Sequence, residues 1–284
     1  MNDVSNNHFK SLFNNLNLGK DGIWSSNLPD SEQGEELQFR EKLAAIEIAN
    51  YLESIAKHHS IPVMDNEVTR FLDLMPHGSI ILDVGGCWGW HWRNIKTIRP
   101  DVRIIIVDFV KSNLQHAKNI IGSLIRNQVE LVHADATTLP FPNTAVDGVW
   151  TVQTFQHIPH YILAFQESYR VLKKNGRFIN YSLHINPFIK FIYKVFGKRY
   201  HLEGDINGVF YLMRANNKQK GELANIFSGE IDDRYSECLF HPEFNLTFTG
   251  KERSWLGKFD HYLGRTYFIP DLIARQRSFE VVKT

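Results

Sequence analysis

The sequence predicts an α/β protein with a mostly parallel sheet and helices on both faces. Short apolar segments alternate with helical segments five times between residues 79 and 183. Strands buried on both faces read as continuous apolar runs, and right-handed crossovers place the connecting helices over the sheet. The 284 residues, 43% of them hydrophobic and 22% charged, are enough for one large core with appendages.

The alternating elements can be placed along the chain. The predicted core strands are 79–86, 102–109, 129–135, 146–152 and 177–183. Helices are predicted over 90–99 and 112–127, and a third one is stopped by Asn175-Gly176, a pair that readily adopts the left-handed conformation. The last residues, 278–284, predict one more strand in the sheet.

The flanking segments are predicted to form appendages. Apolar residues at helical spacing over 35–58, and a second short helix capped by Asp65, indicate a helical cap. The chain is therefore divided into an N-terminal extension and helical cap (1–64), a core (65–185), a lid-like insertion (186–228) and C-terminal strands and a helix that complete the sheet (229–284).

The insertion begins with a predicted amphipathic helix, Pro187 to Phe196. Its aromatic and aliphatic residues recur at helical spacing, with Lys190 and Lys194 between them. Packing as core or lid is the interpretation we favour, and contact with a membrane surface is the alternative. The run is too short to cross a bilayer, so no transmembrane segment is expected.

Charge and cysteine content limit the class of partner. A formal net charge of +1 gives no overall attraction for a polyanion, so nucleic acid is not expected as a partner. Cys87 and Cys238 form no disulfide framework, and no HExxH or CxxC spacing indicates a metal site. The first ten residues lack the layout of a secretory signal. We expect a cytoplasmic protein with a small-molecule substrate.

The segment ILDVGGCWGWHW, residues 81–92, follows the first core strand, where ligands of open parallel sheets bind. Its spacing, D-x-G-x-C-x-G from Asp83 to Gly89, departs from the G-x-G-x-x-G of dinucleotide sites. A carboxylate at the strand end would repel a pair of phosphates, and no Lys-Ser/Thr closes the glycine run as in a P-loop. We therefore expect a ligand that is cationic near Asp83.

ILDVGGCWG resembles the first motif of the class I S-adenosylmethionine-dependent methyltransferases. HADATTLPF (133–141), VDGVWTVQTFQHI (146–158) and SYRVLKKNGRFI (168–179) are similar to later elements of the type 11 subfamily. The resemblance covers about 65–185. It implies a Rossmann-like, seven-stranded, mostly parallel sheet and an enzyme that converts S-adenosylmethionine to S-adenosylhomocysteine.

The resemblance also implies a cofactor site on successive loops. Asp108, which ends the second strand, corresponds to the acid that accepts hydrogen bonds from both ribose hydroxyls. Asp135 would accept a hydrogen bond from the adenine amino group, and Ala136 would offer its backbone N–H. The expected cofactor-binding residues are Asp83, Gly85, Gly86, Cys87, Trp88, Gly89, Asp108, Phe109, Asp135, Ala136 and Thr151.

Cys87 stands where the family has its middle glycine. A nearby helix N-terminus could lower the pKa of this thiol and make it a nucleophile. No Cys-His-Asn arrangement is legible, however, and methyl transfer from a sulfonium needs no enzyme nucleophile. We interpret Cys87 as a small residue beside the methionine moiety of the cofactor.

The acceptor site has weaker signals. Methyl transfer needs mainly alignment, but a hydroxyl acceptor would need a base. His157, after the fourth strand, is the candidate catalytic base, and its alternative role is that of a helix-start residue. Candidate substrate residues are Gln153, Gln156, His160, Tyr181 and His184. Residues 151–154 read TVQT where amino-group methyltransferases of nucleic acids carry an Asn/Asp-Pro-Pro-aromatic motif, which again argues against nucleic acid.

Two functions fit these patterns. The first is a methyltransferase that acts on a small molecule under a lid made by the N-terminal helices and the insertion. The second is a methyltransferase-like binding or regulatory protein that holds the cofactor without turnover, or a relic of the fold that binds a different nucleotide. The enzyme is favoured because the residues that contact the cofactor in the family are all present, and a relic of the fold would not be expected to keep them. These residues are Asp83, Gly85, Gly89, Asp108 and Asp135.

Overall fold

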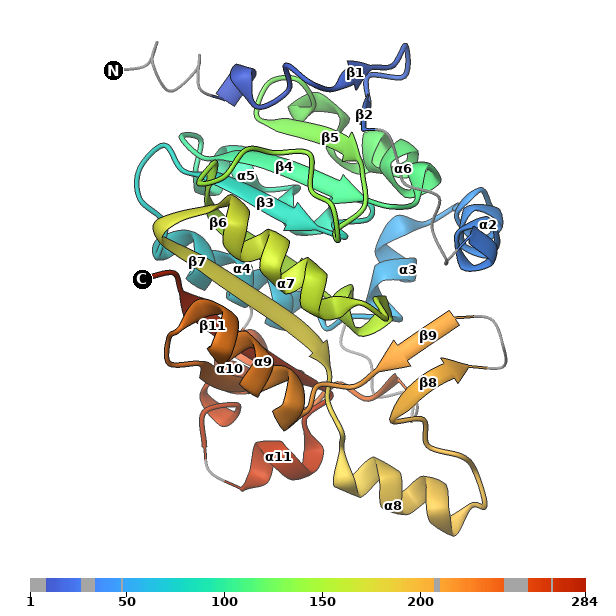
Figure 1. Ribbon diagram of the computed structural model, residues 1–284. Helices are drawn as coiled ribbons and strands as arrows, with labels where there is room; N and C mark the ends of the chain where they lie inside the picture. The colour runs from blue at the N-terminus through green and yellow to red at the C-terminus, as the bar shows by residue number, and fades with distance from the viewer. Residues whose placement is uncertain (1–8, 27–33, 47, 207–209, 243–254, 267) are drawn as a thin grey trace.

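A nine-stranded sheet runs through the molecule in the order β1-β2-β5-β4-β3-β6-β7-β11-β10 (Figure 1). The computed structural model describes residues 9–26, 34–46, 48–206, 210–242, 255–266 and 268–284. The parallel strands at the centre are β5 (Val129–His133), β4 (Arg103–Asp108), β3 (Ile80–Val84), β6 (Val146–Val152) and β7 (Leu172–Leu183). The strand β11 (Gln276–Val282) is antiparallel to β7, and β10 (Asp232–Ser236) is antiparallel to β11.

The predicted fold class is confirmed, but the predicted number of strands was too small. Seven strands, from β5 to β10 in sheet order, correspond to the expected sheet. Two short strands of the N-terminal extension, β1 (Asn17–Leu18) and β2 (Trp24–Ser25), add to its edge, where β2 runs parallel to β5. Trp24 anchors this edge, since its ring stacks on Phe13 and its indole N–H donates to Glu130 at 2.9 Å.

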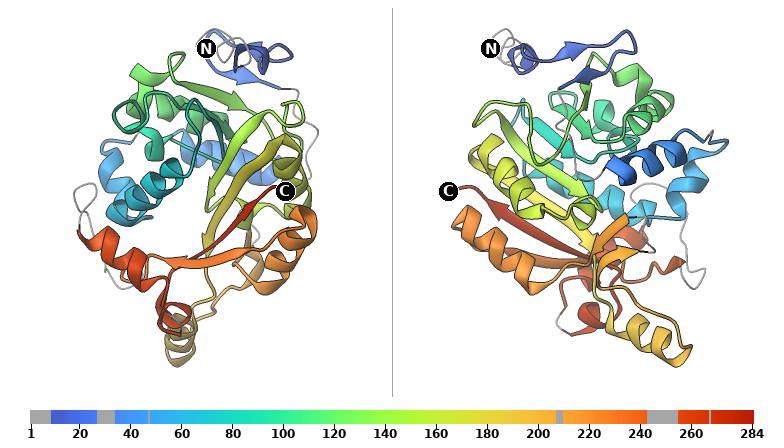
Figure 2. Two further views of the ribbon diagram at one scale, coloured as in Figure 1. Left: turned by 90° about the vertical axis from the view of Figure 1, so that its left-hand side faces the viewer. Right: turned by 45° about the vertical axis from the view of Figure 1, so that its right-hand side comes forward.

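Alternate residues of the strands face two separate helical layers (Figure 2). Ile80 and Leu82 pack towards α7 (Tyr161–Val171) and α9 (Asn217–Phe227). Ile81, between them, packs towards the opposite layer. That layer contains α4 (Ile61–Asp73), α5 (Ile95–Ile98) and α6 (Lys111–Ile121).

Several helices differ from the sequence predictions. The helix expected over 35–58 is broken into α2 (Gly34–Ala44) and α3 (Tyr51–Ala56), and the Asn50 side chain caps α3. Asp65 does not cap α4, which begins after Ser60; its carboxylate instead accepts a hydrogen bond from Arg93 at 2.6 Å. The helix expected over 90–99 is a 3₁₀ turn, Trp90–Trp92, followed by α5.

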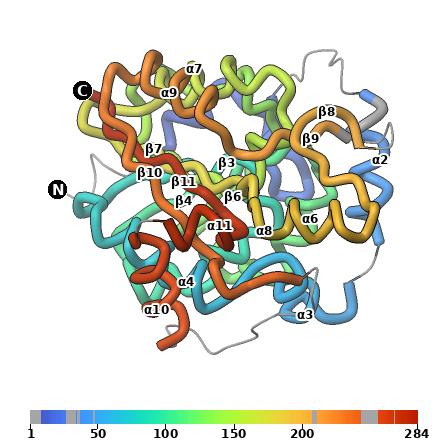
Figure 3. Tube along the Cα trace, turned by 90° about the horizontal axis from the view of Figure 1, so that it is seen from below, coloured from blue at the N-terminus to red at the C-terminus, as the bar shows by residue number. Residues whose placement is uncertain are grey.

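The segment predicted as a lid, 186–228, contains α8 (Pro187–Val195), the hairpin of β8 (Glu203–Ile206) and β9 (Phe210–Met213), and α9. Viewed from below, α8 crosses the rim of the molecule beside α11 (Ile269–Ile273) (Figure 3). The helix α10 (Trp255–Leu263) packs against α4. The division into four segments stays a prediction.

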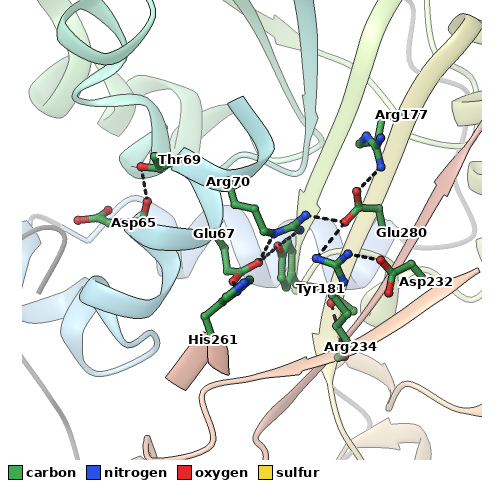
Figure 4. A network of polar contacts seen from close by, with 11 residues as sticks. Asp65, Glu67, Thr69, Arg70, Arg177, Tyr181, Asp232, Arg234, His261 and Glu280 are labelled. Carbon is green, nitrogen blue, oxygen red and sulfur yellow. Dashed lines mark hydrogen bonds and ion pairs between the residues drawn. The ribbon is translucent and has the colours of Figure 1, made fainter. Parts of the chain in front are cut away.

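A buried ionic network joins α4 to β7, β11 and α10 (Figure 4). The Glu67 carboxylate accepts hydrogen bonds from Tyr181 Oη at 2.7 Å and Arg70 Nε at 3.0 Å, and its second oxygen lies 2.7 Å from His261 Nδ1. Arg70 also pairs with Glu280 at 2.8 Å. Burial alone would raise the pKa of Glu67, but the hydrogen bond from His261 and the charge of Arg70 lower it to about 2.

We expect Glu67→Gln to lower the free energy of unfolding at pH 7 by about 3 kcal/mol, because it leaves Arg70 buried with one partner fewer. The depressed pKa of Glu67 stabilises the folded state above the unfolded pKa of about 4.5, and this contribution is lost as the pH falls towards about 2. Urea unfolding at pH 7, 4 and 3 measures the difference between the proteins. Glu53→Gln, in an exposed pair with Lys57, is the control. Identical pH slopes for wild type and Glu67→Gln would contradict the assignment.

Candidate functional site

The loops after four adjacent parallel strands border one pocket at the carboxyl edge of the sheet. The pocket has a volume of about 240 Å³ and opens to solvent. The strands β5, β4, β3 and β6 are neighbours in the sheet, so their loops meet at one place. The predicted residues that line the pocket are Gly85, Cys87, Asp108, Phe109, Asp135, Ala136, Gln153 and His157.

The glycine loop after β3 lies close beneath the loop after β6. Gly85 has φ +72°, and its N–H donates to Val107 O at 2.7 Å. A Cβ on Gly85 would lie 2.1 Å from Thr154 Oγ1, and a Cβ on Gly86 would lie 2.3 Å from Asp83 Oδ2. Only residues without a side chain therefore fit this crossing without a shift of their neighbours.

Asp108, at the end of β4, is held by backbone groups from two loops. Its Oδ2 accepts a hydrogen bond from the N–H of Cys87 at 2.9 Å. Its Oδ1 accepts from the N–H of Val110 at 2.8 Å and, at 3.4 Å, from the Asn113 amide. Since each carboxylate oxygen has two acceptor sites, Oδ2 keeps capacity for a hydroxyl donor in the pocket.

The two acids of the site are both buried, and burial favours their neutral forms. Burial raises the pKa of Asp108 to about 6. Burial, together with the negative charge of Asp108, raises the pKa of Asp83 to about 7, although the indole of Trp92 donates to Asp83 at 2.6 Å. A cationic ligand would favour the ionised form of these acids.

Cys87 combines a strained backbone with a thiol whose pKa is raised. Its φ is +50°, a conformation suited to the glycine that the family has there. Burial and the charge of Asp108 raise the pKa of the thiol well above its usual value, which opposes formation of a thiolate nucleophile. Its backbone N–H contributes to the site instead, by positioning Asp108.

Asp135 and Ala136 lie on the wall made by the loop after β5. Thr137 donates to Asp135 Oδ1 through its backbone N–H at 2.7 Å and its hydroxyl at 2.8 Å. Within the described residues no hydrogen bond goes to Oδ2 of Asp135. This oxygen is available to a donor on a ligand.

His157 ends a chain of hydrogen bonds that crosses the loop after β6. The backbone N–H of Leu183 donates to Gln156 Oε1 at 2.8 Å, and the Gln156 amide lies 3.1 Å from His157 Nε2. His157 Nδ1 lies 2.8 Å from the carbonyl of Tyr211 in β9. A carbonyl only accepts, so Nδ1 carries the proton and Nε2 accepts from Gln156. Burial also lowers the pKa of His157 to about 4, which keeps the ring neutral.

Other predicted residues lie away from the pocket lining. The Asp83 carboxylate packs against Gly86, and the Gln156 amide contacts the His157 ring. The Tyr181 hydroxyl is in the buried network with Glu67, and His184 Nε2 lies 3.0 Å from Asp271 O. The predicted residues outside the lining are Asp83, Gly86, Trp88, Gly89, Thr151, Gln156, His160, Tyr181 and His184.

Three lining residues with polar side chains were not predicted from the sequence. Arg40 reaches the pocket from α2, and Asn113 from the first turn of α6. Thr154 donates to Gly85 O at 3.4 Å and to Val152 O at 3.2 Å. The only signal for Asn113 was its position five residues after Asp108, and Arg40 had none because α2 meets the pocket through tertiary structure. Among the residues described, no group of three or more His, Cys, Asp or Glu side chains could hold a metal ion.

The strand order and the pocket at the carboxyl edge of the sheet agree with the Rossmann-like fold expected from the sequence. Residues 82–180 match the model of the type 11 family described as "Methyltransferase domain", which confirms the predicted resemblance. The demethylmenaquinone methyltransferase of Listeria welshimeri is 28% identical over 134 residues, which are 43% of this chain and 56% of that protein. The chain spans about half the length of the curated relatives it matches.

Solved structures share the fold at low sequence identity. A SAM-dependent methyltransferase from Aquifex aeolicus superposes with a TM-score of 0.51 at 11% identity, over 82% of this chain and 97% of the other. Phosphoethanolamine N-methyltransferase 2 of Haemonchus contortus, in complex with S-adenosyl-L-methionine, has a TM-score of 0.52 at 16% identity, over 77% and 52%. The [4+2]-cyclase SpnF has the same TM-score and identity, over 77% and 80%, so likeness of fold leaves the reaction open.

Proposed function

We propose that this protein is an S-adenosylmethionine-dependent methyltransferase that acts on a small molecule. The observation that carries the proposal is the placement of Asp108. Its carboxylate is fixed by the N–H of Cys87 in the glycine loop and keeps acceptor capacity towards a pocket formed by four strand-end loops. This arrangement suits a ligand with a ribose diol and a positive charge.

The residues of the pocket fit the separate parts of this cofactor. Asp108 would hold the ribose hydroxyls, and Asp135 Oδ2 with the N–H of Ala136 would hold the adenine edge. The loop of Gly85 and Cys87 would leave room for the methionine end. The amide Nε2 of Gln153 is buried without a hydrogen-bond partner among the described residues, so it can donate to the ligand. The bound cofactor supplies a methyl group activated by its positive sulfur.

Under this proposal His157 positions the site and is not its general base. Its Nε2 already accepts from Gln156, and its Nδ1 ties the pocket wall to β9. A group with a pKa of about 4 is also a weak proton acceptor at neutral pH. Alignment and exclusion of water would be the main work of this wall.

We expect His157→Asn to reduce kcat/KM by less than about tenfold, mainly through KM, since loss of a general base costs about 10²–10⁴. Initial rates from pH 6 to 9 should show no ionisation attributable to His157 in the wild type. His160→Asn, three residues further on and exposed, is the matched control. A hundredfold fall in kcat, with loss of a pH limb near 6.5, would make His157 the base.

Binding and turnover need separate experiments. Calorimetry with S-adenosylmethionine tests the cofactor site, and no heat at high micromolar cofactor would exclude it. Release of S-adenosylhomocysteine is then measured against quinols, phenols, acids, sugars and amines, with demethylmenaquinone first because the sequence relatives are named for it. Tight binding without release from any acceptor would favour the alternative, a cofactor-binding protein without turnover.

A further inference from the structure

The outer face of α8 is an exposed apolar stripe. Phe188, Phe191 and Val195 recur at helical spacing, and each is more than half exposed. Phe196, just after the helix, is 72% exposed. The sequence favoured packing of this helix as core or lid, but only Ile189 of its residues is buried. A continuous apolar stripe on a surface helix is uncommon and indicates a partner.

Contacts between the inner side of α8 and the body of the protein keep the apolar stripe exposed. Asn186 caps α8 by accepting from the N–H of Ile189 at 3.0 Å, and its amide donates to Ile273 O in α11 at 2.7 Å. Ile189 is 5% exposed, so the inner face is fixed to the body. On the neighbouring α11, Ile269 and Leu272 are half exposed and enlarge the apolar surface. We call Phe188, Phe191, Val195, Phe196, Ile269 and Leu272 the apolar rim.

Positive charges border the apolar rim. Lys190 and Lys194 flank the stripe on α8, and Lys198 and Arg199 follow it. Residues 186–202 contain no Asp or Glu, and none of the four basic residues has an ion-pair partner within the described part of the chain. Asp271 lies between Ile269 and Leu272 in α11, and its carboxylate accepts a hydrogen bond from the Tyr235 hydroxyl at 2.9 Å.

We propose that the apolar rim docks on an anionic phospholipid surface. Phenylalanine on one face of a helix and lysine beside it is the pattern of helices that lie in a membrane interface. A second copy of the chain would bring the same positive charges to the contact, so self-association through this face is disfavoured. Among the described residues no helix is long and apolar enough to cross a membrane, and docking needs none.

The rim lies close to the candidate site along the chain. The segment after α8 leads into the hairpin β8–β9, and the Tyr211 carbonyl of β9 holds His157 in the pocket wall at 2.8 Å. The proposal does not rest on methyl transfer, because vesicle binding needs neither cofactor nor turnover.

Flotation of the full chain with vesicles tests the proposal. We expect binding to vesicles of phosphatidylcholine with 30 mol% phosphatidylglycerol, roughly tenfold weaker binding to phosphatidylcholine alone, and release in about 1 M salt, where the Debye length falls to about 3 Å. Phe191→Ser/Val195→Ser should weaken binding at least about tenfold. Lys190→Glu/Lys194→Glu should weaken it only on the anionic vesicles.

Matched controls separate this surface from general stickiness. Ile162→Ser/Leu163→Ser changes exposed apolar residues on α7, and Lys96→Glu/Lys174→Glu changes exposed lysines elsewhere. Both controls should bind like the wild type, and circular dichroism checks that every variant is folded. Failure of the wild type to float, or equal binding by the rim variants, would overturn the proposal. So would a wild-type dimer that Phe191→Ser/Val195→Ser splits without any effect on vesicles.

Discussion

Asp108→Ala is expected to weaken S-adenosylmethionine binding at pH 8 by about a hundredfold or more. A hydrogen bond to a charged group contributes about 1.5–3 kcal/mol, and Oδ2 keeps an acceptor site for a ribose hydroxyl. The variant also releases the N–H of Cys87, which Asp108 holds at 2.9 Å, and so loosens the glycine loop. Calorimetry measures the dissociation constant. Asp73→Ala, an exposed acid at the end of α4, is the control and should bind like the wild type.

The same variant tests the pH dependence of binding. Burial raises the pKa of Asp108 to about 6 in the free protein, whereas a cationic cofactor favours the carboxylate. Wild-type affinity should therefore fall as the pH decreases below 7, where Asp83 becomes protonated, and more steeply below 6, where Asp108 does. Asp108→Ala should lose the additional fall below pH 6. A variant with unchanged affinity, or with the full wild-type slope, would show that the ligand does not meet Asp108.

The centre of the sheet could be predicted because the burial pattern of each strand is visible within a few consecutive residues. Each parallel strand is buried on both faces, so β3 and β4 read as apolar runs with an acid next to or at their last residue, Asp83 or Asp108. Parallel strands bring such ends to one edge. Eight predicted residues consequently line one pocket, although they are spread over 85–157.

Features set by tertiary contacts could not be predicted in the same way. Asp65 has the side chain of a good helix cap, but Arg93, 28 residues away, takes its carboxylate. The strands β1 and β2 have two residues each, too few to show a period. Tyr181 lies near the end of β7, where a site residue is expected, yet its side chain faces α4, where its hydroxyl donates to Glu67 at 2.7 Å. The partner in each case is distant in the sequence.

The apolar rim is another feature that could be predicted only in part from the sequence. The spacing of Phe188, Phe191 and Val195 predicts an amphipathic helix and cannot say what covers it. The structure shows that the body takes Ile189 and leaves the other three exposed. Amphipathic periodicity therefore predicts the helix, whereas the side of the helix that faces the body is known only from its packing against α11.

Gly85→Ala is expected to be the most destabilising change in the glycine loop, at about 2–5 kcal/mol. An alanine at φ +72° costs about 1–2 kcal/mol, and the forced contact of its Cβ with Thr154 adds about 1–3 kcal/mol. Cofactor binding should fall with it, because Gly85 lines the pocket. Urea unfolding at pH 7 gives the free energy, and calorimetry gives the affinity.

Two other glycines separate the causes. Gly78 has the same φ of +72° but no atom within 4 Å of an added Cβ, so Gly78→Ala should show the backbone cost alone, about 1–2 kcal/mol. Gly122 has φ −52° and equally open space, so Gly122→Ala should be neutral or stabilising by up to about 1 kcal/mol. The three atoms nearest to the Gly85 Cβ all belong to Thr154. A double-mutant cycle with Thr154→Gly should therefore give a coupling free energy of about 1–3 kcal/mol. If Gly85→Ala lowered the free energy of unfolding no more than Gly78→Ala, the loops after β3 and β6 would not be in close contact.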